Sequence, residues 1–167
     1  MTDALVQFIR ARLDEDGAAA RAATGRGKGS GSWTVEEMAV RAADGAPVLR
    51  HTWAGEGEHI ARHDPERVLR ELVAKRLMLD EALASGHHVS ADQYETCPRA
   101  TKADGLDAAQ MDALTGLNDE QRQESGREPT CWDSCGRDAR VHRTLELLAL
   151  PFVGHPDYMQ ALLADRA

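Results

Sequence analysis

The stretch that decides the fold is DPERVLRELVAKRLMLDEAL, residues 64–83. Asp64 is a helix-capping residue, Pro65 suits the first helical position, and Glu66 places an acid in the first turn. Apolar residues then recur at helical spacing to the end of the stretch, and Gly86 stops the pattern. The stretch therefore predicts the core helix of the protein, ending just before that glycine.

Two further helices are predicted on either side of this one. The first covers residues up to about Thr24, because a stripe of apolar side chains recurs at spacings of three and four near the start of the chain. The second covers residues 141–150, where four leucines and a valine precede Pro151, which cannot continue a helix. The stripe of the first helix consists of Leu5, Phe8, Ile9 and Leu13.

Residues 33–53 change to the alternating pattern of β-strands. The residues Asp44-Gly45-Ala46-Pro47 between two alternating runs are typical of a turn, so the segment predicts a hairpin, bulged near Glu36-Glu37. A lone hairpin is marginally stable and needs a helix to cover it. We therefore expect an α+β fold, mainly helical, in which about three principal helices pack with a small β-hairpin.

Bulky apolar residues are scarce in the chain as a whole. Leu, Ile, Val and Phe number 30 of 167 residues, which is below the roughly 20% at which charged chains become disordered. The deficit falls on residues 86–138, and within them residues 103–138 carry nine acids against three arginines. We expect a single small domain over residues 1–167, with a flexible Gly/Ser linker at 25–32. The polar, acidic insertion at 86–138 is expected to be mobile or pinned by a metal.

Composition also excludes several classes of protein. No apolar run is long enough for a membrane span, and the amino-terminal residues lack the basic region and cleavage site of a secretion signal, which predicts a cytoplasmic protein without membrane contact. The net charge of −8 disfavours binding to nucleic acid, because such binding depends on neutralising phosphates. The arginines of the core helix alternate with glutamates, which predicts a solvated, salt-bridged face.

The three cysteines indicate free thiols or metal ligands, because disulfides are rare in the cytoplasm. Cys131 and Cys135 are separated by three residues, close to the spacing of zinc-binding turns, and a structural zinc ion there would pin the insertion to the last helix. A cysteine nucleophile would need a neighbouring histidine or helix start, and the spacing places none beside these thiols. The remaining zinc ligands would be Cys97 and His142, or would come from His87 and His88.

His59 and His63 form a second candidate metal site. Because they are four residues apart, they would share one face of a helix, as zinc ligands do, and acids lie close to them in the sequence. Such a site with an open position for water would make the protein a metal-dependent enzyme. The alternative is that both imidazoles lie in the segment before Asp64 and hydrogen-bond to the entrance of the core helix.

Three blocks of the sequence together resemble a known family. They are LVQFIRARLDED at residues 5–16, HIARHDPERVL at 59–69, and LELLALPF followed by HPDY at 145–152 and 155–158. In this order they are similar to an uncharacterised family of small proteins from actinobacterial genomes and their phages, a domain of unknown function. The resemblance implies a small α+β unit in a cytoplasmic or prophage-linked setting, and it implies no reaction.

The function expected from these features is that of a non-catalytic interaction or regulatory module with a protein partner. The acidic insertion suits such a role, because a polar segment can fold as it binds. One alternative is the metal-dependent enzyme that would use His59 and His63. A further alternative is a phage-linked inhibitor or nucleic-acid-associated protein, in which the acidic segment mimics the charge of DNA.

Overall fold

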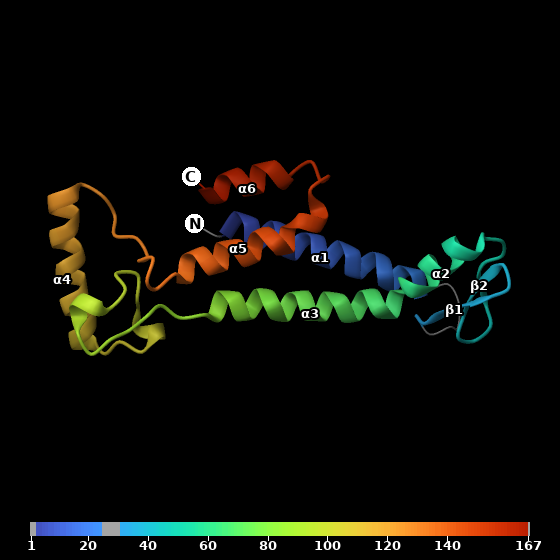
Figure 1. The fold of residues 1–167 in the computed structure, drawn as a ribbon, viewed down its shortest axis with the longest axis horizontal. Helices are drawn as coiled ribbons and strands as arrows, with labels where there is room; N and C mark the ends of the chain where they lie inside the picture. The colour runs from blue at the N-terminus through green and yellow to red at the C-terminus, as the bar shows by residue number, and fades with distance from the viewer. Residues whose placement is uncertain (1–2, 25–30, 167) are drawn as a thin grey trace. The chain divides into compact units, whose positions relative to one another are not determined.

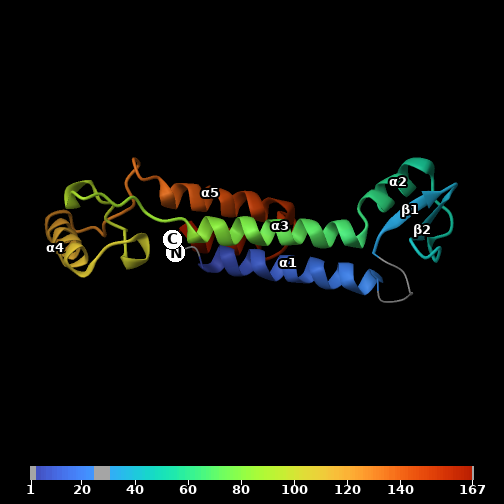
Figure 2. The ribbon, with the colours of Figure 1, turned by 90° about the horizontal axis from the view of Figure 1, so that it is seen from below.

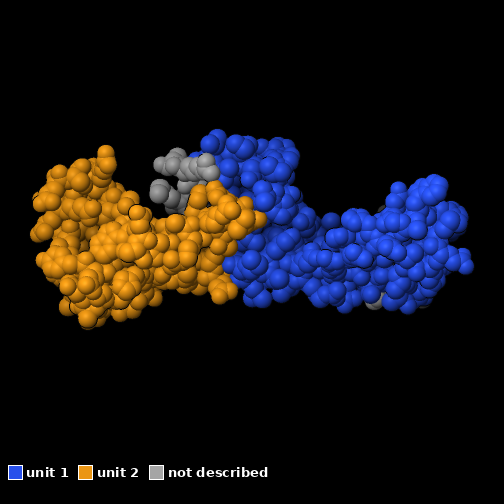
Figure 3. Space-filling view, viewed as in Figure 1, with its two compact units in different colours: residues 1–79, 148–167 blue, residues 80–147 orange. Residues whose placement is uncertain are grey.

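The structure is a computed structural model that describes residues 3–24 and 31–166. It has two compact units: Met1–Leu79 with Leu148–Ala167 make unit 1, and Asp80–Leu147 make unit 2 (Figure 3). Unit 1 contains α1 (Asp3–Thr24), β1 (Trp33–Glu36), β2 (Ala39–Ala42), β3 (Pro47–Leu49), α2 (Ala54–Arg62), most of α3 (Pro65–Ala84), η3 (Leu150–Phe152) and α6 (Tyr158–Arg166). Unit 2 contains the end of α3, η1 (Gln93–Glu95), η2 (Lys102–Asp104), α4 (Ala108–Ser125) and most of α5 (Arg137–Ala149).

α1 is the predicted first helix, and it ends at Thr24 as expected. Leu5, Ile9 and Leu13 are fully buried along its inner face. The ring of Phe8 on the same face meets that of Tyr158 edge to face, at the start of α6. Figures 1 and 2 show α1 alongside α3 within unit 1. The burial of the stripe confirms the helical period of the sequence.

α3 begins as its sequence predicts. Oδ1 of Asp64 accepts a hydrogen bond from the backbone N–H of Arg67 at 2.6 Å, and Pro65 occupies the first helical position. The other carboxylate oxygen of Asp64 accepts one from the N–H of Trp33 at 3.3 Å, which ties the helix start to β1. The predicted salt-bridged face is also present, with ion pairs that join Arg67 to Glu71 and Arg70 to Glu66.

The hairpin expected over residues 33–53 is wrong in its number of strands. Strands β1, β2 and β3 form an antiparallel sheet in that order, and the predicted turn at Asp44–Pro47 joins only β2 to β3. Near Glu37, where a bulge was expected, the chain turns from β1 into β2 with a φ of 56°. A non-glycine residue rarely adopts this conformation, so no local signal marks the turn. The bulge lies instead between Val40 and Arg41.

The expectation of about three principal helices is also corrected, because the described residues contain six α-helices. α2 carries no apolar stripe, and Gly55 and Gly57 lower its helix propensity. α4 lies within the segment expected to be a polar insertion: Asp107 caps its start, and Gly126 ends it in the left-handed conformation. α6, a helix of nine residues, is a further addition to the three expected helices.

Unit 2 has a small hydrophobic cluster in which two of the five buried residues are cysteines. These residues are Cys97, Ala100, Leu106, Leu114 and Cys135. Unit 2 includes residues 86–138, so the insertion has elements of its own, and its mobility stays a prediction, as does the single domain over residues 1–167. Of the linker expected at 25–32, residues 25–30 lie outside the described residues.

Candidate metal centre

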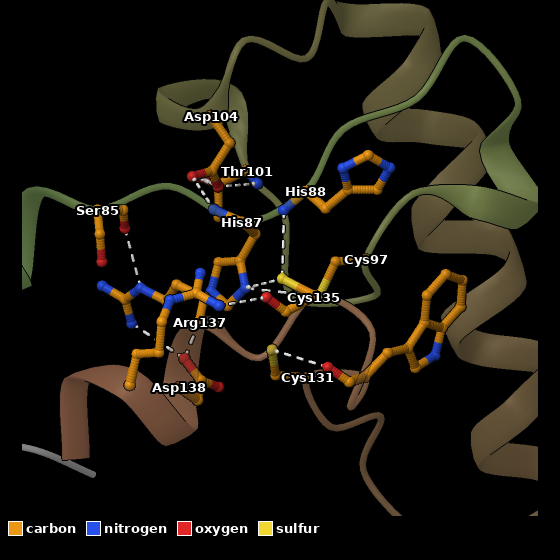
Figure 4. Close-up of polar contacts among 12 residues, drawn as sticks. Ser85, His87, His88, Cys97, Thr101, Asp104, Cys131, Cys135, Arg137 and Asp138 are labelled. Carbon is orange, nitrogen blue, oxygen red and sulfur yellow. Dashed lines mark hydrogen bonds and ion pairs between the residues drawn. The ribbon is translucent and has the colours of Figure 1, made fainter. Parts of the chain in front are cut away.

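Four side chains of the kinds that bind metals converge in unit 2. They are His87, Cys97, Cys131 and Cys135, and their ligand atoms all lie within 4.8 Å of one another. Cys97 is fully buried, Cys135 is 7% exposed, and none of the three thiols is in a disulfide. Figure 4 shows the sulfur atoms of Cys97 and Cys135 turned toward the ring of His87. In the described part of the chain, this is the only convergence of three or more such ligand atoms.

The spacing of these atoms fits a tetrahedral metal site. Nδ1 of His87 lies 3.4 Å from Sγ of Cys97 and 3.8 Å from Sγ of Cys135. Zinc binds sulfur at about 2.3 Å and nitrogen at about 2.0 Å, so neighbouring ligand atoms in a tetrahedral site are about 3.5–3.8 Å apart. Both nitrogen-to-sulfur distances are close to this range, so His87, Cys97 and Cys135 already lie near the positions that zinc requires, and all four ligand atoms lie within 4.8 Å of one another.

A tight turn brings the thiols of Cys131 and Cys135 to the same side of the chain, where both belong to the cluster. The N–H of Gly136 donates to the backbone oxygen of Trp132 at 2.8 Å and closes this turn. Gly136 has a φ of 61°, which L side chains rarely adopt. α5 begins at the next residue, Arg137. The glycine thus allows the chain to pass directly from the second thiol into a helix.

Two carboxylates fix His87. Oδ1 of Asp104 accepts a hydrogen bond from the backbone N–H of His87 at 2.8 Å, and its other oxygen accepts one from the N–H of Thr101 at 2.7 Å. Burial raises the pKa of Asp104, but these N–H groups outweigh it and hold the pKa below its usual value. Nε2 of the His87 ring lies 3.6 Å from Oδ1 of Asp138. A carboxylate beside one ring nitrogen favours the tautomer whose other nitrogen can bind a metal, and here that atom is Nδ1, which faces the thiols.

Arg137 holds the carboxylate that faces His87. Its guanidinium donates to the backbone oxygens of Ser85 and Leu83 at 2.9 and 3.1 Å, and to Oδ1 of Asp138 at 3.0 Å. The first two bonds join the start of α5 to the segment that leads into His87, and Figure 4 shows the bond to Ser85. The third places the Asp138 carboxylate between the guanidinium and the imidazole, so the outer side of the cluster is braced by hydrogen bonds.

The two most buried thiols have opposite pKa shifts. Burial raises the pKa of Cys97 to about 11, against the effect of two backbone hydrogen bonds. Burial also raises the pKa of Cys135, but the backbone N–H groups of His88 and Arg137 outweigh it and lower the pKa to about 6. The first of these N–H groups donates to the sulfur at 3.3 Å. These opposite directions favour ionisation of Cys135 before Cys97.

The structure brings together the three cysteines that were expected to share a metal, but not the expected histidine. His87, which the sequence offered as an alternative, takes the place of His142 in the cluster. Nε2 of His142 lies instead 3.2 Å from Oε1 of Glu146, one turn further along α5. His88, the other alternative, contributes its backbone N–H and not its ring.

His59 and His63 lie in unit 1 as a pair. His59 is in the last turn of α2, and His63 caps that helix by donating its N–H to the backbone oxygen of His59 at 3.1 Å. The two ring centroids are 4.6 Å apart, with the rings tilted by 48°. Among the residues that the structure describes, no third ligand atom converges on the pair.

Three residues that position the cluster were missed from the sequence: Asp104, Arg137 and Asp138. A signal did exist for Asp138, because it is an acid in the first turn of the helix that directly follows Cys135. No comparable signal exists for Asp104, because its contact with His87 joins residues 17 positions apart across an irregular segment.

The cluster can hold a metal ion with all four positions taken by protein atoms. Three thiolates and one imidazole make the pattern of structural zinc sites, whereas catalytic zinc sites keep one position for water or substrate. The expectation that no histidine lies beside a cysteine is wrong, because His87 contacts both Cys97 and Cys135. Cys97 is nevertheless fully buried and Cys135, the thiol with the lowered pKa, is only 7% exposed, whereas a nucleophile must be reached by its substrate.

The fold and the site define a mainly helical α+β protein with a partly buried His/Cys3 cluster. None of the described helices is long and apolar enough to cross a membrane. Residues 2–161 match the protein family described as "Family of unknown function (DUF6221)", and the chain belongs to this family. The expected membership of a family of unknown function is thereby confirmed. No curated protein and no solved structure matches the chain.

Proposed function

We propose that this protein is a non-catalytic zinc-binding module whose metal organises unit 2 for contact with a protein partner. The observation that carries the proposal is the convergence of His87 Nδ1 with three cysteine sulfurs within 4.8 Å. Sulfur-rich, tetrahedral ligand sets favour zinc over magnesium or calcium, which take oxygen ligands. Zinc held in this way needs no further ligand and supports structure.

The small core of unit 2 supports a structural role for the metal. Its buried cluster contains only two leucines besides alanine and the two cysteines. Structural zinc binds zinc-finger peptides with about 10–16 kcal/mol at neutral pH, which is comparable with the entire net stability of an ordinary domain, about 5–15 kcal/mol. Because so few apolar side chains are buried around the ligands, zinc would therefore decide whether the ligand-bearing segments are ordered.

A catalytic metal centre has less support. Catalytic zinc sites use three protein ligands and one open position, whereas His59 and His63 provide two ligands without a third among the described residues. The His/Cys3 cluster has the opposite property, because its four ligands leave no position for water. Both observations favour a structural metal over a catalytic one.

Native mass spectrometry of the full chain after incubation with zinc tests this proposal. We expect one mass increment that corresponds to a single zinc ion per chain, and no such increment when Cys131 and Cys135 are both replaced by serine. The matched control replaces His59 and His63 by alanine and should leave zinc uptake unchanged. A wild-type chain that takes up no zinc, or a His59/His63 variant that loses it, would contradict the proposal.

A further inference from the structure

Two adjoining cavities run along α4 within unit 2. One has a volume of about 660 Å³ and follows the first half of the helix, as far as Leu114. The other, of about 280 Å³, continues from Leu114 to Glu124. Both are bounded on the opposite side by Tyr94 and Thr96. Together they form one groove, the α4 groove, between this helix and the segment that contains η1.

The α4 groove has an apolar floor and aromatic residues at its rim. Leu106 and Leu114 line it and are almost fully buried. Tyr94, which lines both cavities, is 68% exposed, and Trp132 lines the second cavity. Binding sites commonly combine an apolar lining with a few polar groups, and exposed aromatic rings are enriched in them.

The charged side chains that line the α4 groove are all acidic. Asp92, Glu120 and Glu124 line it, and neither cavity is lined by a lysine, arginine or histidine among the described residues. The nearest arginine in the sequence, Arg122, is engaged by Asp119 and Glu128. Among the described residues that line the two cavities, no cation therefore offsets these carboxylates, and a complementary ligand would carry positive charge.

The walls of the groove are built from residues next to the candidate metal ligands. Thr96 and Pro98 flank Cys97 in the sequence, and the backbone oxygen of Pro98 accepts a hydrogen bond from the Asn118 side chain on α4 at 2.9 Å. Thr96 is buried, and its hydroxyl accepts a hydrogen bond from the backbone N–H of Ser90 and donates one to the backbone oxygen of the same residue. The groove thus depends on the same segments that the metal would hold in place.

We infer that the α4 groove binds an extended segment of a partner protein rich in lysine and arginine. The inference rests on the proposed function, because the metal would fix the groove walls. Basic side chains would pair with Glu120 and Glu124 and lie against Tyr94, where a cation above an aromatic ring gains cation–π attraction. Neighbouring aliphatic side chains would occupy the apolar floor. Nucleic acid is disfavoured, because its phosphates would be repelled by the lining carboxylates.

Selection from a displayed library of short random-sequence peptides on the zinc-loaded full chain tests this inference. We expect the recovered peptides to be enriched in lysine and arginine, and their affinity to fall as salt is added. E120Q and E124Q should each weaken a recovered peptide several-fold, and Y94A should do so as well. The matched control is D112N, which removes one negative charge from α4 at a position that does not line the groove.

The inference is overturned if the zinc-loaded chain selects no peptides, or selects peptides without basic residues. It is also overturned if D112N weakens peptide binding as much as E120Q and E124Q do. The same holds if E120Q, E124Q and Y94A all leave peptide binding unchanged. Zinc content measured on the same sample keeps the two proposals apart. Zinc-loaded protein that selects no basic peptide contradicts the groove alone, whereas protein that never takes up zinc contradicts the proposed function.

Discussion

His87 shows how a single residue can be selected for metal binding by its surroundings. Its backbone N–H is held by Asp104, Nε2 of its ring faces Asp138, and Nδ1 faces two sulfur atoms. His142 has no such arrangement, because Nε2 of its ring faces Glu146 on the same helix. The ring of His87 is therefore oriented before a metal binds, which lowers the entropy lost on coordination.

Replacing a residue that hydrogen-bonds to a metal ligand typically lowers metal affinity by about 10–100-fold. Replacing His87 itself by alanine should lower the zinc affinity by more than this. The reason is that the tetrahedral set would lose one of its four atoms. Competition titration against a chromophoric zinc chelator measures the change. His142→Ala and His88→Ala are the matched controls and should leave the affinity unaltered, since neither imidazole belongs to the cluster. Equal losses in H87A and H142A would contradict the assignment of His87.

Asp138→Asn should reduce zinc affinity by about 10–100-fold while the fold is kept. The amide retains the size of the carboxylate but no longer attracts the proton of Nε2, so the ring is less firmly held with Nδ1 toward the thiols. The same titration measures this, with circular dichroism as the check on folding. Asp133→Asn removes an acid between Cys131 and Cys135 that makes no contact with His87, and it should have a much smaller effect. A D138N protein with unchanged affinity would show that the carboxylate has no part in the site.

At the scale of elements, two glycines of unit 2 should respond to alanine in opposite directions. Gly136 has a φ of 61°, and a Cβ there would lie 3.0 Å from Nη1 of Arg140, so Gly136→Ala should destabilise the protein by about 1–3 kcal/mol. Gly116 lies inside α4, and a Cβ there would meet nothing within 4 Å. Gly116→Ala should therefore stabilise the helix by up to about 1 kcal/mol.

Urea unfolding of the two zinc-loaded variants, followed by circular dichroism, measures both effects. Zinc affinity should fall in G136A, because its turn places Cys131 and Cys135 side by side, and should not change in G116A. If both substitutions destabilised the protein by similar amounts, the left-handed conformation of Gly136 would not be the cause of the effect of G136A.

The elements that could be predicted from the sequence are those specified by neighbouring residues. Asp64 and Pro65 specify the start of α3 within a few residues of chain, and the stripe of α1 needs only its own periodicity. The turn at Glu37 and the short helix α2 lack such signals. A left-handed non-glycine residue and a helix containing two glycines are both set by packing against the rest of unit 1.

The candidate site divides in the same way. The spacing of Cys131 and Cys135 is local, so it could be predicted as a pair of ligands. The choice of His87 could not, because it depends on Asp104 and Asp138, which approach it from different elements. Sequence spacing therefore identified the sulfur ligands, and only the tertiary structure identified the nitrogen ligand.

At the scale of the whole molecule, unit 1 and unit 2 differ in what stabilises them. Leu5, Ile9 and Leu13 are fully buried in unit 1, whereas the buried cluster around the candidate ligands in unit 2 consists of alanine, two leucines and two of those ligands. Charge follows the same division, since residues 80–147 carry 14 acids against seven lysines and arginines, whereas the rest of the chain carries 14 against 13. A metal would therefore matter far more to unit 2 than to unit 1.

Removing zinc with a chelator should speed amide hydrogen exchange in α4 and in residues 86–107, while α1 keeps its protection. The reason is that chelation removes the ligand bonds of unit 2 and leaves the leucine-rich core of unit 1 intact. Exchange measured by mass spectrometry on zinc-loaded and chelated samples compares the two units in one experiment. Faster exchange in α1 to the same degree, or no change in α4, would contradict this division.

The central claim is that His87, Cys97, Cys131 and Cys135 bind one zinc ion. X-ray absorption spectroscopy at the zinc edge tests it most directly, because it reports the atoms bound to the metal. We predict a four-coordinate zinc with three sulfur atoms at about 2.3 Å and one nitrogen at about 2.0 Å. A first shell of oxygen and nitrogen without sulfur, or a sixfold shell, would contradict the claim.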